Sequence, residues 1–233
     1  MNREEIMKRF LLLLILLTSS LTLSAQQTRE LREGEDQTKV LYKYPGFVAG
    51  QVILNNGTRT QGLLNYNLYT KTIQFKNEDG TVMDIADPTQ VAYVDMVDRR
   101  FVWRGNNWFE ILGDFGDMSI ACVSYLTAKN EARSSGDYGG QSIASGSHRV
   151  RNYDAATGQF VLSSDQLFVF EEHYEYYIVR KNKFYRTHTV KSIVKPFSDH
   201  KDEVKEYITA NKLDTNNLDD LKTLLKHAVE AKW

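Results

Sequence analysis

The stretch FVAGQVILNNGTRTQGLLNY, residues 47–66, decides the class of fold that the sequence predicts. Residues 47–54 and 60–66 are rich in aliphatic side chains, including the β-branched Val and Ile that favour strands. Between them, Asn55-Asn56-Gly57-Thr58 supplies Asn and Gly, which adopt positive φ at low cost and are typical of hairpin turns. Residues 47–66 therefore predict an antiparallel β-hairpin.

Similar strand-and-turn patterns extend from this hairpin towards the C-terminus. Turns rich in Asn and Gly separate many of these short strands, which are predicted over residues 72–76, 81–85, 91–97, 100–103, 108–112, 118–125, 159–162, 166–170, 174–179 and 184–186. Short strands at near-regular spacing favour an antiparallel meander that curls into a small barrel-like body.

The C-terminal segment predicts two helices. Ser198 or Asp199 can cap the first, and Asn216 or Asn217 can cap the second. Their apolar stripes consist of Val204, Tyr207 and Ile208 in the first helix, and Leu218, Leu221, Leu224, Leu225 and Ala228 in the second. Both stripes need a partner surface, and the nearest one is the sheet. The expected class is therefore α+β, with an antiparallel β meander and two C-terminal helices.

The predicted organisation has five parts. A signal peptide occupies residues 1–25, a flexible N-terminal segment 26–44 and an antiparallel β region 45–126. A Gly/Ser-rich loop follows at 127–159, and residues 160–233 contain a β-hairpin and the two helices. The sequence leaves open whether 160–233 continues the domain of 45–126 or forms a separate small module.

The first 25 residues have the pattern of a secretory signal peptide. Lys8 and Arg9 precede the apolar run Phe10–Leu17, and the small residues of Leu23-Ser24-Ala25 predict cleavage after Ala25 or within a residue or two of it. The alternative is an uncleaved anchor, but the apolar run is shorter than the roughly 20 residues that span a bilayer. We expect export, and no transmembrane anchor after cleavage.

Charge and cysteine content exclude several classes of protein. The chain has 29 Lys+Arg and 30 Asp+Glu, and this balance argues against a dedicated nucleic-acid binder. Cys122 is the only cysteine, so the chain cannot form an intramolecular disulfide. Cys122 is either a nucleophile or a small buried side chain, and the lack of a neighbouring His favours the buried role.

Metal-binding and catalytic motifs are absent from the sequence. None of the five histidines forms an H-x-x-x-H pair, and one cysteine cannot form a zinc finger. His173 and His188 can meet across the predicted 174–186 hairpin, but polar positions on a solvated strand face explain them better. We therefore expect no metal and no other cofactor, and no enzymatic activity.

Two segments have features of a contact surface. Aromatic residues alternate with Arg180, Lys181 and Lys183 over residues 173–186, and such rings can stack on sugars or single strands, although aromatic residues are also ordinary in sheets. The 130–150 loop offers a tyrosine with flexible Gly neighbours. The candidate contact residues are Tyr138, Gly139, Gly140, Tyr174, Tyr176 and Tyr185.

Three stretches resemble a group of proteins from bacterial envelopes. They are residues 50–67, residues 138–142, and Val194-Lys195-Pro196-Phe197 followed by residues 207–213. In this order they resemble uncharacterised exported β-rich proteins of Bacteroidota. The resemblance implies a Gram-negative host and a periplasmic or envelope-associated location, and it provides no activity and no functional residues to transfer.

The sequence favours a non-enzymatic binding or interaction module of the cell envelope, whose partner is an envelope protein or a glycan. The alternative is a periplasmic carrier of a small ligand or lipid, in which the curled sheet encloses a cavity. Phe75, Tyr93 and Trp103 are residues that such a cavity would expose. An enzyme ranks third, because it would need His or carboxylate side chains that converge in a cleft.

Overall fold

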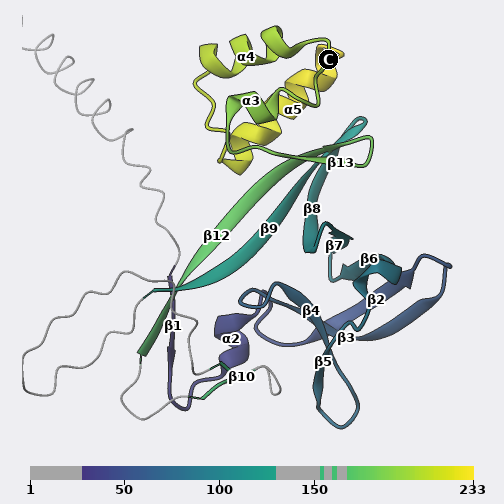
Figure 1. Cartoon of the computed structure of the whole chain (residues 1–233), viewed down its shortest axis with the longest axis vertical. Coiled ribbons are helices and arrows are strands. Elements are labelled where there is room, and N and C mark those ends of the chain that lie inside the picture. Colours follow the sequence, from purple (N-terminus) through teal and green to yellow (C-terminus); the bar gives the residue numbers. More distant parts are fainter. Residues whose placement is uncertain (1–27, 130–152, 155–158, 162–166) are drawn as a thin grey trace, which may run out of the picture.

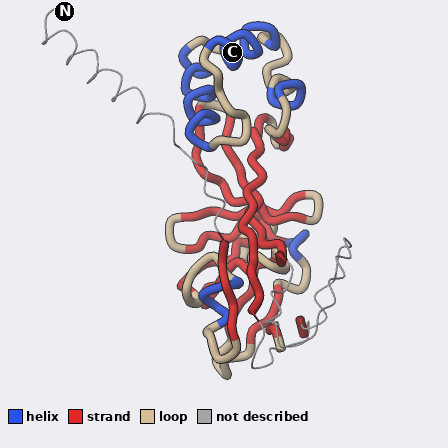
Figure 2. The backbone as a smooth tube through the Cα atoms, turned by 90° about the vertical axis from the view of Figure 1, so that its left-hand side faces the viewer, coloured by secondary structure: helices blue, strands red, loops and turns tan. Residues whose placement is uncertain are grey.

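A single antiparallel sheet dominates the computed structural model, which describes residues 28–129, 153–154, 159–161 and 167–233 (Figure 1). Strands hold 48% of these described residues and helices 20%, so the fold is β-rich. Figure 2 shows an elongated molecule with most helical turns at one end and strands running away from them.

The strands are β1 (Thr28–Arg32), β2 (Val48–Leu54), β3 (Arg59–Asn67), β4 (Thr72–Lys76), β5 (Val82–Asp84), β6 (Val91–Met96), β7 (Arg99–Arg104), β8 (Asn107–Phe115), β9 (Met118–Lys129), β10 (Tyr153–Asp154), β11 (Gln159–Phe160), β12 (Leu167–Arg180) and β13 (Lys183–Arg186). The helices are α2 (Gln37–Leu41), the 3-10 turn η1 (Pro88–Gln90), α3 (Val190–Ile193), α4 (Lys201–Ala210) and α5 (Leu218–Glu230).

The main sheet is open. Its strand order is β1-β12-β9-β8-β7-β6-β2-β3-β4-β5, with β13 also paired to β12, while β10 and β11 pair separately. The antiparallel sheet is confirmed, but β6 pairs with β2 and not with β5, and among the described residues no pairing joins β1 to β5, so the sheet is not a closed barrel. Strand β5 has three residues and offers little edge for closure.

Strands β9 and β12 form the longest pair in the sheet. Their register runs over 12 consecutive residues, from Val169↔Lys129 to Arg180↔Met118. In Figure 1 this ribbon runs from the β1 and α2 end of the molecule to the C-terminal helices. The prediction of two separate strands at 166–170 and 174–179 was wrong, because Glu171 and Glu172 continue the strand that the sequence pattern interrupts. The ribbon also joins strands of the 45–126 and 160–233 regions in one sheet.

One face of the ribbon contacts two separate hydrophobic cores. We call it the front face; it carries the alternate residues Cys122 and Ser124 of β9 and Glu172, Tyr174 and Tyr176 of β12, which lie opposite one another in the register. At one end of this face is the main core, to which the ribbon contributes Leu126, Phe168 and Phe170. At the other end is the helical core, made of Met118, Ile120, Ile178, Ile193, Phe197, Val204, Ile208, Leu221, Leu224, Leu225 and Ala228.

The opposite, reverse face carries a third and smaller cluster. Phe109, Ala121 and Val123 are buried there, and the rings of Tyr177 and Phe184 lie 4.9 and 4.5 Å from the Phe109 ring. Because side chains alternate along a strand, neighbouring aromatic residues of β12 separate onto opposite faces.

The segment that follows the predicted cleavage site is ordered from Thr28 onward. Within the segment 26–44, for which the sequence predicts flexibility, β1 pairs with β12 and α2 packs beside β1. Leu31, Leu41 and Tyr42 are buried in the main core. The few apolar residues of this polar segment are therefore the ones that anchor it.

The C-terminal helices agree with their predicted apolar stripes. Asn217 caps α5 by accepting hydrogen bonds from the backbone N–H groups of Asp219 and Asp220. The first predicted cap was wrong, since His200 and not Ser198 or Asp199 precedes α4, and its side chain makes no capping bond. Both helices pack on the helical core.

Substitution in α5 tests whether the helical core stabilises the fold. Leu225 is 0% exposed, and we expect Leu225→Ala to lower the free energy of unfolding by about 2–5 kcal/mol, because it leaves a cavity. Val229, one turn further along α5, is 44% exposed, and Val229→Ala should change it by less than about 1 kcal/mol. Urea unfolding followed by circular dichroism measures both; equal losses would contradict this assignment.

Candidate functional site

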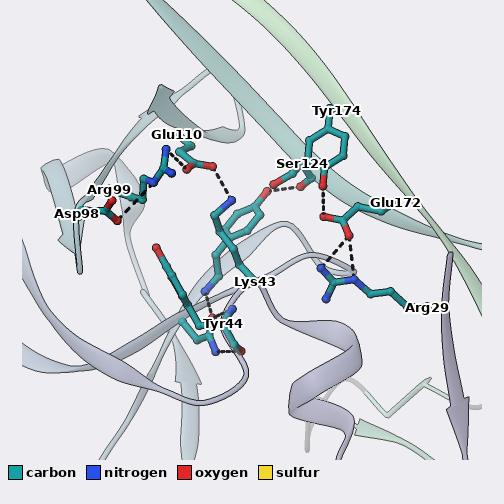
Figure 3. Close-up of polar contacts among 11 residues, drawn as sticks. Arg29, Lys43, Tyr44, Asp98, Arg99, Glu110, Ser124, Glu172 and Tyr174 are labelled. Carbon is teal, nitrogen blue, oxygen red and sulfur yellow. Dashed lines mark hydrogen bonds and ion pairs between the residues drawn. The ribbon is translucent and has the colours of Figure 1, made fainter. Parts of the chain in front are cut away.

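A belt of polar and charged side chains separates the two cores on the front face. We call it the polar belt; it consists of Arg29, Lys43, Arg99, Glu110, Ser124, Glu172 and Tyr174 (Figure 3). Its members come from β1, β7, β8, β9 and β12 and from the segment between α2 and β2. The belt lies where neither core covers the ribbon.

Arg29 and Glu172 form the centre of the belt. The Arg29 Nε and Nη2 atoms lie 2.9 and 2.8 Å from Glu172 Oε2, and Arg29 Nη1 donates to the carbonyl oxygens of Val40 and Tyr42 at 3.0 and 2.8 Å. Glu172 is 7% exposed, so its charge is compensated by a guanidinium that also bonds the end of α2. This contact ties β1, β12 and α2 together.

Tyr174 extends this network to the surface. Its hydroxyl donates to Glu172 Oε1 at 2.7 Å, and Figure 3 shows the ring inclined along β12 towards that carboxylate. Tyr174 is nevertheless 45% exposed. The hydrogen bond to the buried Glu172 therefore holds the ring in one orientation, while much of the ring faces solvent.

A second ion-pair group lies beside the first. Lys43 Nζ is 2.7 Å from Glu110 Oε2, and Arg99 Nη1 is 3.6 Å from Glu110 Oε1. Asn65 fixes the segment that carries Lys43: its side-chain amide donates to the carbonyl oxygens of Tyr44 and Gly46, each at 2.9 Å. Two cations thus compensate the buried Glu110.

The predicted contact residues Tyr174, Tyr176 and Tyr185 share the front face. The Tyr174 and Tyr176 rings are parallel within 6° and their centroids are 6.4 Å apart; we call these two residues the tyrosine pair. Tyr185 lies opposite Ile178 in the β12–β13 register, and so on the same face, and is half-buried. Burial raises the pKa of Tyr176 to about 12, with smaller effects from the nearby Cys122, Asp219 and Glu110.

Neither the other predicted contact residues nor the basic Arg180 provides a described, free surface. Tyr138, Gly139 and Gly140 lie outside the described residues. Arg180 is not free for a ligand, because its guanidinium bonds Asp117 and the carbonyl oxygens of Pro196 and Trp233. The aromatic–basic hairpin is thus partly structural.

The histidines and the cysteine have structural surroundings. His173 contacts Thr127, 2.7 Å away, and stacks on Tyr125, and no contact with His188 is present. Within the described ranges, no group of three His, Cys, Asp or Glu side chains is placed to hold a metal ion. Cys122 is buried, and burial together with the charge of Glu110 raises its pKa to about 12, so it is a thiol at neutral pH.

Comparison with protein-family models, curated proteins and solved structures finds no match to this chain. None of the helices in the described part of the chain is both long enough and apolar enough to cross a membrane.

Sequence reasoning did not identify the residues that support the tyrosine pair. Arg29, Lys43, Glu110 and Glu172 carry no motif, and their partners lie far away, with Arg29 and Glu172 separated by 143 positions. One signal was available: Glu172 interrupts the alternate apolar positions Phe168 and Phe170 of one strand face. A carboxylate in such a pattern indicates a buried charge with a distant partner.

Removal of Arg29 tests the centre of the belt. Arg29→Ala leaves Glu172 buried without its cation, and we expect a loss of about 3–5 kcal/mol in the free energy of unfolding. Arg32→Ala, which breaks the exposed pair with Glu30 on the same strand, should cost about 0–1 kcal/mol. Adding Glu172→Gln to Arg29→Ala removes the uncompensated charge and should recover part of the lost free energy of unfolding, as measured by urea unfolding. If the double variant recovers nothing, the loss does not come from the buried charge of Glu172.

Alkaline pH should destabilise the protein. Burial is the main reason that the pKa values of Tyr44, Tyr176 and Tyr177 rise from 10.0, and that of Cys122 from 9.0, to about 12 in each case. The unfolded chain releases these protons at lower pH than the folded one, so the contribution of these groups to the free energy of unfolding is constant below about pH 8 and falls as the pH rises towards 12. Urea midpoints that are equal at about pH 8 and about pH 11 would refute this prediction.

Proposed function

We propose that the protein is an exported binding module of the cell envelope and that it contacts its partner through the tyrosine pair. Export is supported by the basic and apolar pattern of residues 8–25. The single observation that carries the binding role is the Tyr174 ring, which is 45% exposed although its hydroxyl is fixed by the buried Glu172. An exposed aromatic ring held in one orientation loses little conformational entropy on binding.

The neighbouring side chains support this location. Tyr176 packs partly against the helical core, so the second ring is also held in place. The front face carries the candidate residues Tyr174, Tyr176 and Tyr185 together, with Tyr185 opposite Ile178 of the helical core. We propose a non-enzymatic role, since the groups around the pair are engaged with one another in ion pairs and hydrogen bonds.

The carrier alternative has less support. Phe75 and Trp103, which a cavity in the curled sheet would expose, pack against the main core. Tyr93 lies under the Arg100 guanidinium, whose carbon is 4.1 Å from the ring centroid. We therefore favour the binding module, in the periplasm or associated with the envelope.

Binding to the native envelope tests the proposal. Purified mature protein is mixed with cell envelopes from the organism that encodes it, and the bound fraction is measured by co-sedimentation over a range of protein concentrations. We expect Tyr174→Ala to weaken this binding by about tenfold, because an aromatic contact at the centre of an interface contributes about 1.4 kcal/mol or more.

Two further variants serve as controls. Tyr93→Ala removes a half-buried tyrosine from β6, outside the pair, and should bind like the wild type. Tyr174→Phe retains the ring, and should bind more tightly than Tyr174→Ala. Thermal melting confirms that each variant is folded; if folded Tyr174→Ala binds as well as the wild type, the tyrosine pair is not the contact surface.

A further inference from the structure

The charges beside the tyrosine pair are compensated within the protein. Arg29 pairs with Glu172, and Lys43 pairs with Glu110. Arg99 lies near Glu110 and also pairs with the adjacent Asp98, so these three cations face three carboxylates. Asp219 of α5, whose charge helps to raise the pKa of Tyr176, pairs with Lys222: the Lys222 Nζ atom lies 3.0 Å from Asp219 Oδ1. Each of these charged groups therefore already has an opposite charge beside it, which leaves little for a phosphate, an acidic polymer or a basic peptide to neutralise there.

The two tyrosines offer different groups to an occupant. Tyr174 exposes part of its ring, and its hydroxyl, already donating to Glu172, still has lone pairs that can accept. The Tyr176 hydroxyl makes no hydrogen bond with another described residue, so it can both donate and accept. The pair thus combines aromatic surface with neutral hydrogen-bonding groups.

We infer that the occupant of the tyrosine pair is a neutral glycan, an inference that rests on the proposed function. A pyranose ring has an apolar face of C–H groups that packs on an aromatic ring, and hydroxyls at its rim that bond to neutral polar groups. A lipid tail would leave the hydroxyls and the adjacent ion pairs beside hydrocarbon, which is costly. A nucleic acid or charged peptide would have to compete with these internal ion pairs for an opposite charge.

A competition experiment in the envelope co-sedimentation assay tests which class of molecule occupies the tyrosine pair. The competitor is the soluble material from exhaustive pronase digestion of the same envelopes, which destroys proteins and leaves glycans intact. A second portion is oxidised with periodate, which cleaves the vicinal diols of sugars, and is then quenched. We expect the first portion to displace the wild-type protein and the oxidised portion to lose most of this activity, by about tenfold or more.

Salt dependence distinguishes a neutral glycan from a charged one. Binding of a neutral occupant should be unchanged, within about twofold, between about 0.05 and 0.5 M NaCl, because screening acts only on charged partners. A steep fall in affinity over this range would overturn the neutral assignment.

The outcomes separate this inference from the proposed function. If binding depends on Tyr174 but the pronase digest does not compete, or competes equally after periodate, the partner is not a glycan and only the inference fails. If binding to untreated envelopes does not depend on Tyr174, the proposed contact surface fails as well. In the control, the pronase digest should displace the Tyr93→Ala variant as well as it displaces the wild type. Equal displacement confirms that the assay reports on the tyrosine pair.

Discussion

The twelve-residue pairing of β9 with β12 organises the whole fold. One face of this ribbon contacts the main core at one end and the helical core at the other. Strands β1 and β13 pair with opposite ends of β12, and β8 continues the sheet from β9. The N-terminal segment and the C-terminal helices are thereby attached to the same element.

A face shared by two cores leaves an interval that neither covers. In this interval the polar belt places Glu110 and Glu172 in buried positions, which is tolerable only because Lys43, Arg99 and Arg29 compensate their charges. The exposure and fixed orientation of Tyr174 result from this arrangement, since its hydroxyl bonds to a carboxylate that is itself held by Arg29.

Elements with local signals were predictable from the sequence. The turn at Gly57 has φ of +85°, which Gly adopts freely, and the strands on both sides form as the pattern predicts. Strand β1 and helix α2 were missed because their sequence is polar; β1 pairs with β12, more than a hundred residues away, and α2 packs on β1. The interruption of β12 at Glu171 and Glu172 was misleading for the same reason, since Lys129 compensates the charge of Glu171 and Arg29 that of Glu172.

The antiparallel β-rich class, the apolar stripes of α4 and α5 and a cap at Asn216 or Asn217 follow from the sequence alone, because turns, caps and periodicity depend on neighbouring residues. Only the tertiary structure decided that the sheet stays open, that Tyr174, Tyr176 and Tyr185 share a face, and that Arg29 meets Glu172. Strand register between distant segments is set by which side chains pack together, and a shift of one residue would move every side chain to the other face.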